Sequence, residues 1–201
     1  MLSFIKVESF KLSKKLKSWL GPLLVMILVL IAFPLSIDIS QYDLDKFYFS
    51  IIVVSLLMTA FVATEGMFEE DFEDGSLEQE FLKEKDFYKL VISKIFVYVC
   101  LIGIPIAFIG ALFSFANGVA IGSFGKVFLL LSLSNLLLFN LFAFGNALSI
   151  NKGAMLGVLS SLPLALPVII LLGRAIRSIQ YGDGYFSVTT LMLGIGLMVS
   201  A

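Results

Sequence analysis

The carboxylates of this sequence are concentrated in one short segment. Ten of the fifteen acidic residues lie between Glu65 and Asp86. Only four lysines lie between Glu65 and Lys94, so this stretch carries a net charge of −6, although the whole chain carries only −1. An acidic segment is unusual beside an anionic lipid surface. The charge therefore predicts binding to a protein partner that has a basic groove.

The sequence contains no recognisable catalytic or metal site. Histidine, a common metal ligand and the usual general base at neutral pH, is absent. No serine lies in a Gly-x-Ser-x-Gly turn, and no paired acids lie within an apolar run. The segment Ala120–Val127 comes nearest to a phosphate loop, but it lacks the first glycine and the Ser or Thr after Lys126. We expect no catalytic residue and no metal site, and energy for uphill work must come from another subunit or an ion.

Local signals predict a defined shape for the acidic segment. We expect the helix that precedes it to continue to about Glu73. The pair Asp74-Gly75 then predicts a sharp turn. Ser76 and Gln79 have the spacing of a capping box, which predicts a second short helix over about residues 77–86. The result would be an elbow of two helices, which we place at residues 65–89.

Apolar side chains on this acidic, water-exposed elbow indicate a docking surface. The alternative is a solvated, disordered acidic loop, which would not need a turn signal and a capping box together. The candidate docking residues are Glu65, Phe68, Asp71, Asp74, Gly75, Ser76, Leu77, Glu78, Gln79, Phe81 and Leu82.

The composition of the whole chain indicates the class of protein to which the elbow belongs. Of its 201 residues, 59% are hydrophobic and 14% are charged, whereas soluble domains are about 45–50% apolar and about 25% charged. A soluble fold of this size could not bury so much apolar surface. We therefore predict an all-α integral membrane protein in a lipid bilayer, with one transmembrane domain over residues 1–201 and no nucleic-acid partner.

Six apolar runs have the length of a membrane span, about 17–25 residues. With the N-terminus inside, inner segments hold ten basic residues and outer segments hold four, so both termini are predicted to be cytoplasmic. Arg174 and Arg177, predicted in the outer loop after span five, oppose this trend. The predicted spans are Trp19–Ile37, Phe47–Thr64, Leu90–Ala116, Val127–Ile150, Gly153–Leu172 and Tyr185–Ala201.

Residues 1–18 are predicted to form an amphipathic helix in the cytoplasmic membrane interface. The alternative is a basic flank that only fixes topology. The apolar residues that share one arc of about 100° are Leu2, Ile5, Leu12, Leu16, Trp19 and Leu20.

Polar residues and prolines recur within spans four and five. Two asparagines on one stripe need partners in hydrocarbon, either on another helix or along a substrate path, and both readings stay open. Prolines four residues apart remove two backbone hydrogen bonds and predict a kink or break. Gly103 and Pro105 can do the same in span three. The residues concerned in spans four and five are Ser132, Asn135, Asn146, Ser149, Pro163 and Pro167.

The run Glu65–Gln79 resembles the cytoplasmic signature of the heme exporter protein B family (CcmB). Its Asp-Gly-Ser-Leu-Glu-Gln core is specific, and the likeness continues over residues 1–175 in order and spacing. Phe33–Ser36 is similar to the end of the family's first span, and Leu162–Leu164 with Pro167 to its fifth. The matching elbow positions are Glu65, Phe68, Asp71, Asp74, Gly75, Ser76, Leu77, Glu78 and Gln79.

The resemblance implies the membrane subunit of an ABC-type complex for cytochrome c maturation. It implies a separate ATPase subunit that binds ATP, a second copy of this chain, a heme-handling membrane partner and a heme chaperone. Heme would be a possible cargo and not a bound cofactor of this chain. The fold would be ABC-2-type exporter-like, in a bacterial inner membrane or the equivalent mitochondrial membrane. Two alternatives are an ABC-2-type permease for another cargo and a non-transporting membrane scaffold.

Overall fold

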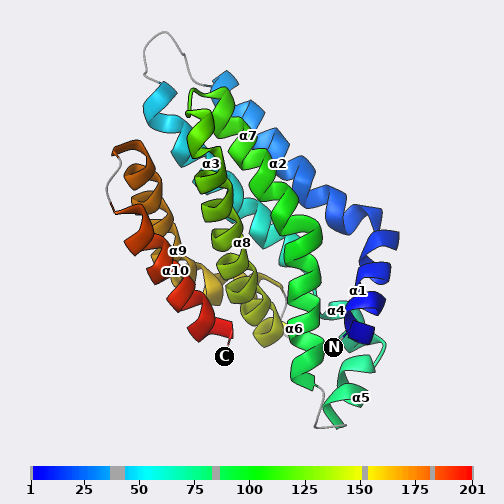
Figure 1. Cartoon of the computed structure of the whole chain (residues 1–201). Helices are drawn as coiled ribbons and strands as arrows, with labels where there is room; N and C mark the ends of the chain where they lie inside the picture. The colour runs from blue at the N-terminus through cyan, green and yellow to red at the C-terminus, as the bar shows by residue number, and fades with distance from the viewer. Residues whose placement is uncertain (1, 37–43, 83–86, 151–153, 182–183, 201) are drawn as a thin grey trace.

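The computed structural model describes residues 2–36, 44–82, 87–150, 154–181 and 184–200, and every regular element in these ranges is a helix (Figure 1). The helices are α1 (Leu2–Lys14), α2 (Leu16–Ser36), α3 (Leu44–Thr64), α4 (Glu69–Glu73), α5 (Ser76–Leu82), α6 (Phe87–Tyr98), η2 (Val99–Gly103), α7 (Ile104–Ala116), α8 (Ile121–Ser149), α9 (Ala154–Tyr181) and α10 (Tyr185–Ser200).

Five stretches in the described ranges are long and apolar enough to cross a membrane. They overlap the first five predicted spans. The sixth predicted span corresponds to α10, whose 16 residues extend only about 24 Å, less than the roughly 30 Å of a hydrocarbon core. Six spans therefore remain a prediction. The five stretches are Ser18–Ser36, Tyr48–Glu73, Tyr88–Ala116, Ile121–Ser149 and Ser160–Ile179.

Helix α8 lies at the centre of the bundle and packs against α3, α7, α9 and α10 (Figure 1). Its Leu130, Leu131 and Phe139 are fully buried. At Gly145, a Cβ atom would lie 2.6 Å from the carbonyl oxygen of Gly157 in α9. Only glycine fits this crossing, a close approach that small residues permit in membrane bundles.

Two of the predicted irregularities have different outcomes. Span three contains a π-helical turn, η2, which ends at Gly103, two residues before Pro105. Span five has no break, because α9 continues through Pro163 and Pro167. Membrane helices tolerate proline when neighbouring groups satisfy the freed backbone. The helix also extends to Tyr181, so Arg174 and Arg177 lie within α9 and not in a loop.

The elbow is built differently from its prediction in two respects. The predicted continuous helix to Glu73 is wrong, because α3 ends at Thr64 and Gly66 has a positive φ of 66°. The predicted capping box is also wrong. Ser76 already belongs to α5, and the side chain of Asp74 accepts the Ser76 N–H at 2.8 Å. The predicted turn is present, with Gly75 at φ 72°.

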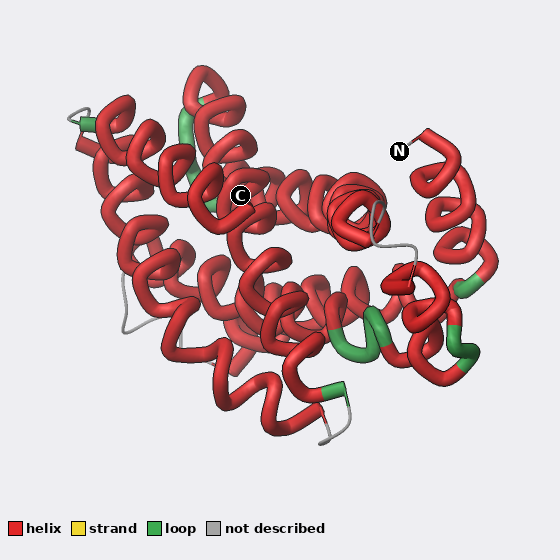
Figure 2. Tube along the Cα trace, turned by 90° about the horizontal axis from the view of Figure 1, so that it is seen from below, coloured by secondary structure: helices red, strands yellow, loops and turns green. Residues whose placement is uncertain are grey.

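The N-terminal helix is separate from the first span, as predicted, but it is shorter. It ends at Lys14, and α2 begins at Leu16. Leu12, on the predicted apolar arc, is buried, and α1 packs against α6. Figure 2, viewed from the end that carries α4 and α5, shows α1 at the edge of the bundle.

Candidate docking site

A cluster of buried charges connects the elbow to two other helices. Asp71 of α4 is 1% exposed, and its Oδ2 accepts a hydrogen bond from Lys94 Nζ of α6, which is 4% exposed. Its Oδ1 accepts a hydrogen bond of 3.0 Å from Lys11 Nζ of α1. Glu8 Oε2 lies 3.9 Å from Lys94 Nζ. One carboxylate thus holds α1, α4 and α6 together.

Glu8, Asp71 and Lys94 are buried, so their charges depend on one another and on the partly exposed Lys11. The hydrogen bond to Asp71 raises the pKa of Lys11. Burial raises the pKa of Glu8, although Lys94 opposes this shift. Breaking a buried ion pair by removing one partner costs about 3–5 kcal/mol. The cluster therefore fixes where the elbow lies relative to α1 and α6.

A second ion pair between the same elements lies at the surface. Lys15, just after α1, donates a hydrogen bond to the Glu70 carboxylate of α4. Both side chains are about half exposed, so this pair contributes less than the buried cluster. It extends the contact between the basic N-terminal helix and the acidic elbow.

The predicted docking residues divide into an inner and an outer group. Asp71 and Phe68 are buried and face the protein. Phe81 and Leu82 of α5 are 66% and 80% exposed. The exposed side chains of the elbow are thus both acidic and apolar, the composition on which the predicted docking surface depends. The residues exposed on it are Glu65, Asp74, Glu78, Gln79, Phe81 and Leu82, while Gly75, Ser76 and Leu77 are partly exposed.

Hydrogen bonds to Asp74 stabilise the turn between the two elbow helices. Ser76, through its hydroxyl and its backbone N–H, lowers the pKa of Asp74. The single hydroxyl proton of Ser76 has the Asp71 carbonyl oxygen, 3.2 Å away, as its other acceptor. Asp74 therefore stabilises the turn and also contributes an exposed negative charge.

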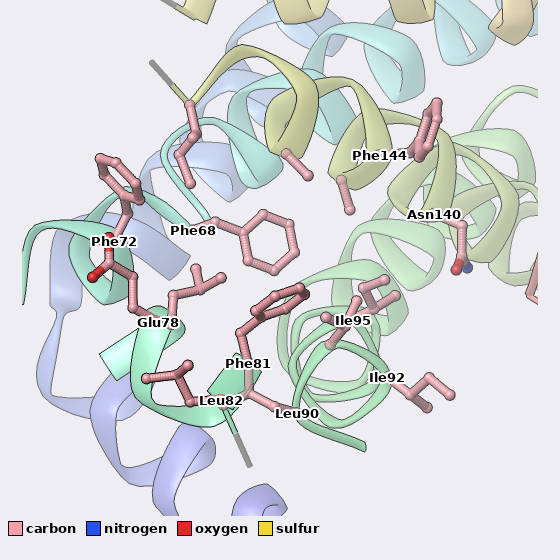
Figure 3. A pocket seen from close by; sticks show the side chains of 15 residues that line it. Phe68, Phe72, Glu78, Phe81, Leu82, Leu90, Ile92, Ile95, Asn140 and Phe144 are labelled. Atoms are coloured by element: carbon pink, nitrogen blue, oxygen red, sulfur yellow. The ribbon is translucent and has the colours of Figure 1, made fainter. Parts of the chain in front are cut away.

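An apolar groove of about 740 Å³ lies between α5, α6 and α8 (Figure 3). Phe68 and Phe81 both point into this space. Glu78 and Asn140 are the polar or charged side chains that line it. Beside this groove, the elbow is attached to the bundle both by the buried charges and by an apolar cluster, in which Leu77, Val91 and Ile95 pack around Met67, Phe68 and Ala143.

The polar residues of α8 lie between helices. Asn135 Nδ2 donates to the Gly103 carbonyl at 2.8 Å, beside the π-helical turn. Asn146 Nδ2 donates to the Thr64 carbonyl at 2.7 Å and so caps the end of α3. Ser132 and Ser149 donate to carbonyl oxygens of their own helix. These contacts favour the helix-packing reading over the substrate path.

Sequence reasoning did not assign Lys94 or Glu8 to the site. The available signal was the position of Lys94 in an otherwise apolar span, because an ionisable side chain there needs an oppositely charged or hydrogen-bonding partner. In the described ranges no group of three or more Cys, Asp or Glu side chains could hold a metal ion.

Comparisons with known proteins agree on one family. The family model described as CcmB protein matches residues 5–201. Heme exporter protein B of Pseudomonas aeruginosa is 30% identical over 164 residues, which is 81% of this chain and 74% of that protein. The protein of the same name from Haemophilus influenzae is 28% identical over 199 residues, 96% of this chain and 90% of that protein. The Escherichia coli protein is 33% identical over 86 residues, 43% of this chain and 39% of its own length.

Proposed function

Because this chain belongs to the CcmB family, we propose that it is the membrane subunit of a heme-export system for c-type cytochrome biogenesis. The observation that carries the proposal is the family match over residues 5–201, joined to a protruding acidic elbow between α3 and α6. The expected location is a bacterial inner membrane or its mitochondrial equivalent, with both termini cytoplasmic.

In this proposal, ATP is hydrolysed by a separate subunit that docks on the elbow. The chain itself offers carboxylates and apolar side chains, including Glu78, Phe81 and Leu82, to a basic groove. A partner can shift a conformational equilibrium only through contacts that differ between the two states. The exposed elbow supplies a surface for such contacts.

Movement of the elbow would reach the membrane helices through the buried charges. Asp71 is joined to Lys94 near the start of span three and to Lys11 in α1. Asn146 joins the end of α3 to α8. A displaced elbow would therefore displace α1 and α6 first. The transported or released species would be heme, or a heme-loaded chaperone received from a heme-handling membrane partner.

Deletion of the gene in its host tests this function. We expect c-type cytochromes to lose covalent heme on heme-stained gels, with recovery on re-expression of the wild-type chain. Membrane b-type cytochromes, measured by absorbance, serve as the control and should not change. Normal c-type cytochromes after deletion would contradict the proposal, and loss of a different exported compound would identify an ABC-2-type permease for another cargo.

A further inference from the structure

Both arginines of the chain lie within one turn of α9, whereas its twelve other basic residues are lysines. Arg174 and Arg177 are exposed and fall inside the candidate span Ser160–Ile179. The C-terminal part of α9, to which they belong, lies toward the end of the bundle away from α4 and α5 (Figure 1). Arginine within a span is costly and marks a site with an anionic partner.

Among the residues that the structure describes, neither arginine forms an ion pair with a carboxylate. Residues three apart on a helix are neighbours, so the two guanidinium groups form one positive patch. Guanidinium groups bind phosphate oxygens in a bidentate manner that lysine cannot reproduce. The patch therefore has the chemistry of a phosphate site.

An apolar groove of about 320 Å³ between α3 and α9 begins at this patch. Its walls include Val53 and Val54 of α3 and Ile169 and Ile176 of α9. Ser50 and Arg177 are its polar lining residues. Val54 is 40% exposed, so the groove opens on the outer surface of the helices, where a bilayer would lie.

We propose that this groove binds an anionic phospholipid. One acyl chain lies against the valine and isoleucine side chains, and the head-group phosphate accepts hydrogen bonds from Arg177, with Arg174 adding charge. Guanidinium groups beside an apolar groove offer a phosphate head group both the charge and the hydrogen bonds that it can accept. Heme fits less well, because the lining residues include no Cys, Met or Tyr that could bind iron.

Gly173 also lines the groove, so its substitution tests the site without changing the charge of the arginines. A Cβ atom at Gly173 would meet no atom within 4 Å. Gly173→Leu should therefore fill the groove without disturbing the α3–α9 contact. Lys126, a basic residue near the start of α8 that does not line this groove, supplies the matched control, Lys126→Gln.

The experiment measures phosphatidylglycerol retained by the purified full-length protein, by native mass spectrometry after exchange from mixed phosphatidylglycerol and phosphatidylcholine. We expect Arg177→Gln and Gly173→Leu each to weaken retention about tenfold, the effect of one lost charge-assisted contact. Arg177→Lys should lose part of the retention, and Lys126→Gln should retain the wild-type amount.

Equal retention in wild type and in all the groove variants would overturn the proposal. So would equal binding of phosphatidylcholine, because the site would then not recognise negative charge. A heme titration of the same variants, followed by absorbance, tests whether the groove binds heme instead of phospholipid. If the arginine variants lose heme absorbance while they keep phosphatidylglycerol, the groove is a heme site and the phospholipid proposal is wrong.

Discussion

Lys94 is the cation that the two buried carboxylates of the charge cluster share. It lies in an apolar span, is 4% exposed, and faces both Asp71 and Glu8. Its charge balances carboxylates from two helices that are far apart in the sequence. Without it, Asp71 would keep its hydrogen bond from Lys11, and Glu8 would lose the cation that lies 3.9 Å from its carboxylate.

We predict that Lys94→Met destabilises the protein by about 3–5 kcal/mol, because it leaves a buried charge without its partner. The double variant Lys94→Met/Asp71→Leu should recover a large part of this loss, since apolar residues can replace a buried pair. Thermal unfolding in detergent measures both. A double variant that is no more stable than Lys94→Met would show that the pair does not act as a unit.

At the residue scale, the sequence predicted the charge of the elbow but not its burial. The acidic cluster placed Asp71 on the outer surface with Asp74 and Glu78, whereas Asp71 points inward to two lysines. Charge counts along the chain contain no information about which side chains meet across 60 residues. The basic N-terminal helix contained the missing partner, and only the fold brings it to the elbow.

At the scale of elements, the crossing of α8 and α9 rests on two glycines. A Cβ atom at Gly145 would lie 2.6 Å from the Gly157 carbonyl oxygen and 2.8 Å from Ser161 Cβ. The backbones would have to separate to admit it. Gly125 lies in the same helix with no atom within 4 Å of its Cβ position, so it provides a matched comparison.

We predict that Gly145→Ala destabilises the bundle by about 1–3 kcal/mol, the usual cost of overpacking. Gly125→Ala should be neutral or stabilise α8 slightly, because alanine is the better helix former. Unfolding of both variants in mixed micelles measures the difference. If the two variants unfold alike, the close approach of α8 and α9 does not limit stability.

Hydropathy and span length predicted the long helices well, because a bilayer demands long apolar segments. The helix ends were harder to predict. Gly66 ends α3 near Thr64, where the sequence favoured a continuous helix, while Pro163 and Pro167 leave α9 intact. Local rules for glycine and proline cannot show which backbone groups a neighbour will satisfy. The Asn146 side chain, which caps α3, is such a neighbour.

At the scale of the whole molecule, a net charge of −1 conceals two opposite regions. The lysine-rich α1 and the acidic elbow are separate in the sequence but lie together at one end of the bundle (Figure 1). Lys11 pairs with the buried Asp71, and Lys15 pairs with Glu70 at the surface. Glu65, Asp74 and Glu78 stay exposed. Charge separation along the chain thus becomes an inner contact and an outer acidic surface.

The most direct test of this account is co-purification of an ATPase subunit with Glu78→Lys. Glu78 is exposed on α5, and its substitution reverses a surface charge without altering the Asp74 turn. Lys126→Glu, near the start of α8, is the control for a charge reversal elsewhere. Asp74→Asn keeps an oxygen that can accept the hydrogen bond from the Ser76 N–H but removes the negative charge. This variant therefore distinguishes the effect of the Asp74 charge from the effect of its hydrogen bond in the turn.

The measurement is the amount of ATPase subunit retained per membrane subunit after purification in detergent, with ATP hydrolysis assayed on the same samples. The account predicts that Glu78→Lys loses about tenfold of the binding, as expected for a charge pair turned repulsive, while Lys126→Glu retains it. Full retention and ATPase activity in Glu78→Lys would contradict docking at the elbow.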